Sequence, residues 1–356
     1  MMAWSHTGGV CFLIIFSFVL VACLCPIVSG SSADEKLFKI FIKKYAKTYS
    51  AGSAEYKNRF RIFKESLARH KQLNSFRTHP RDAFFGITRF ADMTPEEFAS
   101  TLLGGRSRRP EVAGDAPKSD TWRKFAADAG INLPGKDIPR KFTLQNKRPP
   151  VLTAVKNQGS CGACWAFSIV ECLETQHALK TRTLYDLSTQ QVMDCNNVTS
   201  DGGCKGGNLC GTLDWLQTSK EKITLAKNYP FKKKSESCNV PATSHGLVYL
   251  RNSTCQSYVD KEEEMVSLLF SHGPLLAAVD ATSFQDYMGG IIQHHCTAYY
   301  ENHAVQIVGY DKTGEIPYYI IRNSWGADWG LGGYLHIKIG GDLCGIARTV
   351  GSVDTN

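Results

Sequence analysis

Residues 158–167 read Gln-Gly-Ser-Cys-Gly-Ala-Cys-Trp-Ala-Phe, and this stretch is expected to organise the whole fold. The apolar residues after it recur at helical spacing, which predicts an amphipathic helix: Ala166, Ile169, Val170, Leu173, Ala178 and Leu179. Cys164 therefore lies at a helix N-terminus, where free N–H groups and the helix dipole favour an anion. A thiol placed there is expected to lose its proton easily, and the thiolate is its reactive form.

The composition is that of a globular protein. The chain has 356 residues, of which 43% are hydrophobic, and its formal net charge is +8. This hydrophobic fraction is enough to bury a sizeable core. Basic and aromatic residues are not clustered together, so we do not expect a nucleic acid as a partner.

The N-terminus resembles a targeting segment. Residues 10–28 are mostly apolar and are followed by small residues, which predicts a signal peptide over residues 1–30. Its apolar core is shorter than the roughly 20 residues that a membrane span prefers, so stable membrane association is not expected. A secreted chain can form disulfides. Three of the 13 cysteines would leave with the signal peptide, and a free Cys164 leaves an odd number, so one more thiol is unpaired within the chain.

Two polar residues far downstream can complete a nucleophilic site with Cys164. A thiolate needs a base, and the base needs a group that orients it. His303 follows Cys164 by 139 residues, and Asn323 follows His303 by twenty. Each lies at the end of a strand pattern, and the polar turn 311–314 separates the two patterns. A hairpin centred on residue 313 would set His303 and Asn323 opposite each other.

The stretch 158–167, together with His303-Ala304 and residues 323–326 (Asn-Ser-Trp-Gly), resembles the active-site segments of the papain family of cysteine proteases. This resemblance implies an α+β fold of two lobes with the active site in the cleft between them. A helical lobe would span about 138–245 and an antiparallel β-barrel lobe about 246–356. Strand patterns in the second part agree with this division: 275–279, 304–310, 318–322 and 334–339.

The resemblance also implies a role for each residue of the site. Cys164 would attack the peptide carbonyl as a thiolate paired with the His303 imidazolium. Asn323 would orient His303, and Trp325 would shield their contact from water. The carboxamide of Gln158 and the N–H of Cys164 would stabilise the oxyanion.

Substrate-binding residues follow from the same resemblance. They would surround the substrate and its second residue before the cut: Gly162, Gly206, Gly207, Asn208, Leu209, Ala278, Ala304, Thr349 and Trp325. Two polar side chains, Asn208 and nearby Glu301, argue against a purely aliphatic or aromatic preference. Asn302 stands where papain has an aspartate, so the acid limb of the pH profile should differ.

Residues 31–137 are expected to form an inhibitory propeptide and a linker. Four residues on one predicted helix face resemble the first propeptide signature of the family: Glu55, Arg59, Phe63 and Asn74. Ser66 and His70 depart from that signature. Residues 86–92 resemble the second signature, with Thr88 replacing an asparagine. The sequence 94–97, Thr-Pro-Glu-Glu, predicts a helix start, and residues 104–137 are interpreted as a solvated linker before a mature enzyme that begins near Ile138.

Three disulfides are implied by the resemblance: Cys161–Cys204, Cys195–Cys238 and Cys296–Cys344. We predict a fourth bridge between Cys172 and Cys210, whose helices should pack together, and Cys255 would then be the odd thiol. Asn197 and Asn252 begin glycosylation sequons.

The sequence is also compatible with other classes of function. Cys161 and Cys164 form a C-x-x-C pair, as in redox proteins, but neither the preceding Gln-Gly turn nor the distant His303 fits such a domain. A catalytically silent peptide-binding homologue is the main alternative. His294 and His295 are adjacent and would chelate a metal poorly, and no cofactor is expected.

Partners and location follow from the family. We expect protein or peptide substrates, the protein's own propeptide and cystatin-like proteins as inhibitors, and a monomer. The lysosome is the expected compartment, with secretion as an alternative. Several segments depart from papain and cathepsin L towards another branch of the family: 273–280, 285–296, 302–305 and 311–314.

Overall fold

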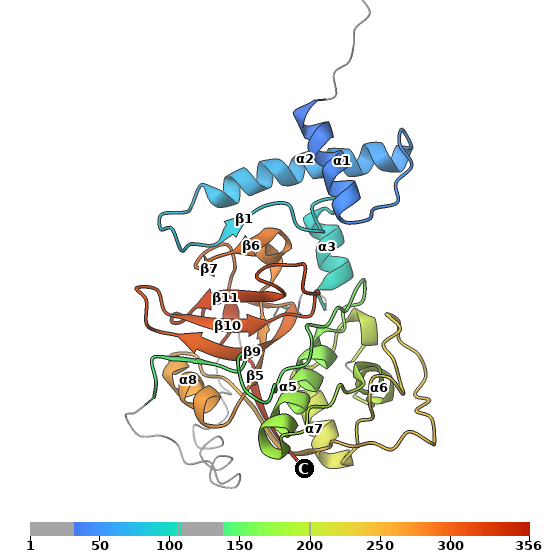
Figure 1. Cartoon of the computed structure of the whole chain (residues 1–356), viewed down its shortest axis with the longest axis vertical. Helices are drawn as coiled ribbons and strands as arrows, with labels where there is room; N and C mark the ends of the chain where they lie inside the picture. The colour runs from blue at the N-terminus through green and yellow to red at the C-terminus, as the bar shows by residue number, and fades with distance from the viewer. Residues whose placement is uncertain (1–31, 105–106, 109–137, 199–200) are drawn as a thin grey trace, which may run out of the picture.

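The computed structural model describes residues 32–104, 107–108, 138–198 and 201–356. The expected signal peptide and most of the expected linker lie outside these residues. Figure 1 shows three regions: two crossed N-terminal helices at the top, a β-sheet below them, and a group of helices beside the sheet. The α+β class and the helix-rich and strand-rich parts are as expected. None of the helices in the described ranges is long and apolar enough to cross a bilayer.

The N-terminal region (residues 32–108) is built on helices α1 (Ala33–Lys44), α2 (Ala54–Asn74) and α3 (Pro95–Leu102). An aromatic cluster of buried Phe38, Phe41 and Phe63 holds α1 against α2. Helix α3 begins where the sequence predicted. Thr94 caps it and Glu97 returns the bond to the Thr94 N–H, which satisfies two otherwise free donors.

Helices α5 (Cys164–Thr181), α6 (Thr189–Cys195) and α7 (Leu209–Ser219) form the helical part. Helix α5 was expected to be amphipathic, but this prediction was wrong. Every residue from Cys164 to Ala178 is buried, because the sheet covers one side of the helix and α6 and α7 cover others. Among the polar residues that this buries, Glu174 accepts bonds from Thr153 and from the Leu187 N–H.

One eight-stranded sheet forms the β part. Its strand order is β4-β12-β5-β9-β10-β11-β7, and β3 pairs with β9 off this path. The bounds are β3 Lys141–Thr143, β4 Leu250–Gln256, β5 Leu275–Val279, β7 Ile291–Ile292, β9 His303–Asp311, β10 Tyr318–Arg322, β11 Tyr334–Lys338 and β12 Val350–Thr355. The sheet is antiparallel except for the parallel β7/β11 pair. Helix α8 (Glu262–Ser271) lies beside β9.

The N-terminal region docks on the β part by adding short strands to it. Strand β1 (Phe84–Phe85) pairs with β6 (Tyr287–Gly289), which follows the short helix η2 (Thr282–Asp286). Strand β2 (Ser107–Arg108) pairs with β8 (Tyr300–Glu301). The chain between them, including α3, passes the boundary between the sheet and the helices (Figure 1). The functional site lies at this boundary.

Candidate active site

Cys164 is the first residue of α5, as the sequence predicted. Ala163 occupies the N-cap and offers no side-chain oxygen, so no side chain caps the first turn. The Ala166 N–H donates to the Ala163 carbonyl at 3.0 Å, and the N–H groups of Cys164 and Trp165 act to lower the pKa of the thiol. The Cys164 side chain is only 3% exposed.

His303 and Asn323 meet directly. The His303 ring Nε2 lies 2.7 Å from Asn323 Oδ1, so the ring donates to the amide oxygen. This bond leaves Nδ1 unprotonated in the neutral ring, and among the described residues Nδ1 has no hydrogen-bond partner. The Trp325 indole packs on the imidazole with a centroid distance of 4.6 Å and is fully buried. Nδ1 is thus the nitrogen that can exchange a proton with a neighbouring thiol.

The hairpin register behind this contact differs from the expected one. The last paired residues of β10 and β9 are Arg322 and Gln306, and the register shifts at Ile320/Ile321. His303 and Asn323 are therefore not directly opposite each other, and a turn centred on residue 313 was wrong. The irregularity in β10 could not be read from the sequence, because the strand pattern continues through it without a break. Asn323 lies just beyond the end of β10, where its side chain can still reach the His303 ring.

Gln158 is fully buried, and both ends of its side chain are bonded. Its Nε2 donates to the carbonyl oxygens of Leu102 at 2.8 Å and Cys161 at 2.9 Å. Its Oε1 accepts a bond from Ser324 Oγ at 2.6 Å, which fixes the direction of the amide. The Gln158 Nε2, which was expected to donate to an oxyanion, thus already donates to a carbonyl oxygen of the N-terminal region, that of Leu102.

Gly104 follows Leu102 by two residues and lies in the lining of the pocket beside Cys164. Its N–H donates to the carbonyl oxygen of Asn302 at 2.8 Å, one residue before His303. A Cβ built on Gly206, whose φ is +113°, would lie 2.2 Å from the Gly104 oxygen, so the two backbones touch. Residues 104 and 107–108 were interpreted as solvated linker, and this was wrong, because the first contacts Gly206 and the others pair with β8. The Gly104-Gly105 pair was the available signal for such a close approach.

Burial sets the protonation of the site. Desolvation raises the pKa of the Cys164 thiol to about 11, although nearby backbone N–H groups act to lower it. Desolvation also lowers the pKa of His303 to about 4, and its bond to Asn323 only partly opposes this. The sequence predicted an easily ionised thiol, but in this form the neutral thiol and neutral imidazole are favoured, because burial outweighs the helix terminus.

A pocket of about 610 Å³ opens beside the thiol. Cys164 and His303 line it together with every residue that was expected to surround the second substrate residue: Asn208, Leu209, Ala278, Ala304 and Thr349. Gly206, Gly207 and Glu301 also line it, whereas Gly162 and Trp325 do not. Asn208 also caps α7 by accepting a bond from the Gly211 N–H. Lys205, Trp165 and Gly202 belong to the same lining, although the sequence did not predict them there.

Three of the expected disulfides are present, namely Cys161–Cys204, Cys195–Cys238 and Cys296–Cys344. The predicted fourth bridge was wrong. Cys210 pairs with Cys255, and Cys172 is a free, fully buried thiol on α5. Cys210 is the second residue of α7, which lies against β4, the strand that carries Cys255. The Cys161–Cys204 bridge also removes the C-x-x-C redox pair, because Cys161 is not available to Cys164.

Ser66 and His70, which depart from the family signature, belong to a polar contact between α2 and the β part. Arg69 binds Asp286 through Nε at 2.6 Å and through a second nitrogen at 3.0 Å. The His70 Nε2 lies 3.0 Å from the same carboxylate, and Ser66 accepts a bond from Arg69. Burial acts to raise the pKa of Asp286, but the bonds from His70 and Arg69 outweigh it and the pKa is lowered.

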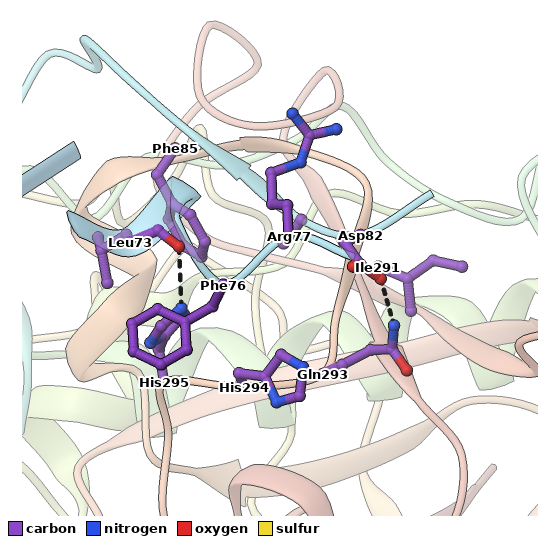
Figure 2. Close-up of a pocket in the computed structure, with 10 residues that line it drawn as sticks. Leu73, Phe76, Arg77, Asp82, Phe85, Ile291, Gln293, His294 and His295 are labelled. Atoms are coloured by element: carbon purple, nitrogen blue, oxygen red, sulfur yellow. Dashed lines mark hydrogen bonds between the residues drawn. The ribbon is translucent and has the colours of Figure 1, made fainter. Parts of the chain in front are cut away.

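His294 and His295 lie in a second docking contact, which Figure 2 shows. The His295 Nε2 donates to the Leu73 carbonyl at 3.1 Å. The His295 ring also packs in T-shaped geometry with the rings of Phe76 and Phe85, at centroid distances of 4.8 and 5.5 Å. Nearby, Gln293 donates to the buried carboxylate of Asp82. The histidine pair thus lies in the contact with the N-terminal region. Within the described ranges, no group of three or more side chains that could bind a metal was found.

Comparison with known proteins agrees with this geometry. Residues 138–353 match the papain family cysteine protease, and residues 38–98 match the cathepsin propeptide inhibitor domain. Human cathepsin O is 42% identical over 292 residues, covering 82% of this chain and 86% of that protein, and mouse cathepsin O is 40% identical, covering 82% and 88%. The digestive procathepsin L2 of Tenebrio molitor superimposes with a TM-score of 0.76 at 27% identity, covering 90% of this chain and 99% of that structure.

Proposed function

Because the chain belongs to the papain family of cysteine proteases, we propose that it is a cathepsin O-like endopeptidase made as a zymogen in the secretory pathway. Residues 1–30 would be the signal peptide, 31–137 the propeptide with its linker, and 138–356 the peptidase. The lysosome is the proposed site of action, because acid would activate the zymogen there. The sequons at Asn197 and Asn252 are consistent with this route.

Catalysis would follow from the geometry of four side chains. The Cys164 sulfur attacks the peptide carbonyl carbon as a thiolate, and the Gln158 Nε2 and the Cys164 N–H bind the resulting oxyanion. The His303 imidazolium gives its Nδ1 proton to the leaving amine, which breaks the peptide bond and leaves a thioester. His303 then takes a proton from water, and attack of the hydroxide on the thioester releases the acid product and restores the Cys164 thiolate beside the His303 imidazolium. Asn323 holds the ring in the orientation that both proton transfers need.

The observation that carries the proposal is the hydrogen bond from Gln158 to the Leu102 carbonyl, with Gly104 lying beside Cys164. The propeptide backbone occupies the positions that a substrate backbone would need. Burial of Cys164 and His303 by this segment would keep the pair neutral until the propeptide leaves. Inhibition by the propeptide and catalysis thus use the same groups.

The test starts from the purified full-length chain, acidified with a thiol reductant. We expect peptide hydrolysis to appear as the propeptide is removed and to stop when one thiol-reactive epoxide has bound per chain. Cys164→Ala should abolish both hydrolysis and labelling. A processed chain that hydrolyses no peptide, and whose Cys164 reacts no faster than free cysteine, would instead be a peptide-binding homologue.

A further inference from the structure

Arg322 is a fully buried cation that directly precedes Asn323, the residue that orients His303. It is the last residue of β10. Its Nη2 donates to the carbonyl oxygens of Thr153 at 2.8 Å and Ala154 at 2.7 Å, and to Thr153 Oγ1 at 3.0 Å. A buried guanidinium is costly without hydrogen-bond partners. Three of its partners lie on residues 153–154, so the end of β10 is tied to that segment.

A second set of contacts joins Arg322 to β9 and to α5. Its Nη1 donates to Gln306 Oε1 on β9 at 3.3 Å. The Gln306 Nε2 in turn donates to the Glu171 carbonyl oxygen at 2.9 Å and to Thr175 Oγ1 at 3.0 Å, both on α5. The Glu171 carboxyl group lies 3.6 Å from the guanidinium, and both side chains are buried. Arg322 and Gln306 thus form one polar contact between the sheet and the helix.

This network lies on the same four segments as the groups of the active site, namely Gln158, Cys164, His303 and Asn323. The segment before Gln158 contains residues 153–154, and α5, which begins at Cys164, contains Glu171 and Thr175. Strand β9 begins at His303 and contains Gln306. Arg322 itself is not part of the pocket lining beside Cys164. One buried side chain therefore fixes the four segments relative to one another without contacting the substrate pocket.

The pairing of β9 with β10 ends before Asn323. The register already shifts within β10, and Asn323 lies one residue beyond the strand. Its N–H donates to the Gly333 carbonyl at 3.0 Å, and its Nδ2 has no hydrogen-bond partner among the described residues. The place of its amide oxygen, which accepts the bond from His303, therefore depends on where Arg322 holds the end of the strand.

We propose that Arg322 is a positioning residue for catalysis, which holds Asn323 so that its amide oxygen orients the His303 ring. The inference rests on the protease function proposed above. A misplacement of about 1 Å can lower a rate about a hundredfold, even when the change lies far from the reacting atoms. Loss of the Arg322 contacts should therefore be visible in kcat.

The experiment compares enzymes processed from the full-length wild-type, Arg322→Lys and Arg322→Met chains at pH 5. Each enzyme is titrated with the epoxide, so that rates refer to active sites. We expect kcat to fall about tenfold to a hundredfold in both variants, with KM changed less than about threefold, because Arg322 lies outside the pocket lining. A lysine keeps the charge but replaces the planar fork of donors by one compact group, so it cannot keep all of these contacts.

The two variants make different demands on the fold. Arg322→Met removes the charge, and burial raises the pKa of the Glu171 carboxyl to about 7, although the charge of Arg322 acts to lower it. Glu171 is therefore mostly neutral at pH 5, and the loss of Arg322 strands no carboxylate there. Arg322→Lys retains a buried cation, and it tests the inference if Arg322→Met does not fold.

A matched control shows whether any change at a buried ion pair has this effect. Arg251→Lys alters a cation that pairs with Asp354 between β4 and β12. Neither strand carries a group of the active site. The kcat of Arg251→Lys should stay within about twofold of the wild-type value.

A double-mutant cycle tests whether Arg322 acts through Asn323. The rate of Cys164 alkylation at pH 5 is measured by mass spectrometry, because it reports the thiolate paired with His303 and needs no bound peptide. Arg322→Lys should lower this rate at least about fivefold in the wild-type background. In the Asn323→Ala background it should lower the rate less than about twofold, because the residue through which it acts is absent.

Two kinds of outcome would overturn the inference, and they are distinguishable. A kcat that changes less than about threefold in the Arg322 variants, or an equal loss of alkylation rate with and without Asn323, would leave Arg322 a structural role only and the protease function intact. No hydrolysis by the processed wild-type chain and no epoxide labelling of Cys164 would overturn the protease function, and the inference with it.

Discussion

The carbonyl oxygen of Leu102 accepts a 2.8 Å hydrogen bond from Nε2 of Gln158, across 56 residues of sequence. Leu102 is the last residue of helix α3 in the propeptide. The Gln158 side chain is fixed in the peptidase by the hydrogen bond that it accepts from Ser324. The propeptide therefore satisfies the donor that we assign to the oxyanion.

Asp286→Asn should loosen the propeptide. The carboxylate is almost fully buried and binds Arg69 and His70, and hydrogen bonds to a charged group contribute about 1.5–3 kcal/mol. We expect faster activation at pH 5 and, in a Cys164→Ala background, faster hydrogen exchange in α2. Glu65→Gln is the matched control, because its pair with Arg61 is exposed and should contribute little. Unchanged activation and exchange in Asp286→Asn would show that the contact does not retain the propeptide.

His295 should weaken propeptide docking in acid. Burial lowers its pKa, the bond to Leu73 partly opposes this, and the charge of His294 lowers it further. The docked state therefore favours the neutral ring. Its contribution to docking is complete above the free value of about 6.5 and is lost as the pH falls below that value. Arg77 and Asp82 line the same contact, and the low pKa of Asp82 keeps it charged through this range.

The measurement is hydrogen exchange in β1 of the full-length Cys164→Ala chain between pH 7 and 5, corrected for intrinsic exchange. Protection should decrease as the pH is lowered. In His295→Gln this decrease should be less steep, by an amount that corresponds to the uptake of at most one proton on opening. His245→Gln is the control, because His245 lies near Thr224 in the helical part. Equal pH dependence in the wild type and His295→Gln would contradict the account.

Asn302→Asp should shift the acid limb of the kcat/KM profile. Asn302 Nδ2 donates to Asp280 Oδ1 at 3.0 Å, and both residues are buried. A carboxylate at 302 would lie against that of Asp280, so one of the two must take up a proton within the working pH range. Asn239→Asp, an exposed substitution of equal charge, should leave the profile unchanged. An Asn302→Asp profile identical to wild type would contradict the prediction.

The Cys210–Cys255 bridge should contribute substantially to stability. It joins α7 to β4 across a sequence separation of 45 residues. Loss of a disulfide in a loop of this size typically costs about 2–4 kcal/mol, so the double change Cys210→Ser/Cys255→Ser should lower the free energy of unfolding by that amount in denaturant titrations. Alkylation of both cysteines in the wild-type chain without reductant would show that the bridge is absent.

The sequence predicted what depends on local pattern. Strands β5 and β10 have the expected bounds, because each is an apolar run between turn residues. Helix α5 begins at Cys164, and α3 begins at the Thr94 capping box. These features need only neighbouring residues. The side-chain contact between His303 and Asn323 was also expected, although the register of the hairpin that brings them together differs from the expected one.

The rest depends on packing between distant segments. The partner of Cys210 was missed because sequence does not tell which side of α7 faces β4. The raised pKa of Cys164 was missed because it results from burial of the thiol, which depends on the packing of segments far apart in the sequence. The role of His70 was missed because Asp286, its partner, lies 216 residues away.

The central claim is that the propeptide keeps Cys164 buried and protonated, and that its removal creates the reactive thiolate. The most direct measurement is the rate of Cys164 alkylation at pH 7, followed by mass spectrometry, before and after propeptide removal. Cys164→Ala, which leaves Cys172 as the free thiol within residues 138–198 and 201–356, gives the background. The rate should rise at least about a hundredfold on removal, because each unit of pKa lost changes the thiolate fraction about tenfold. Equal rates in the two forms would contradict the account.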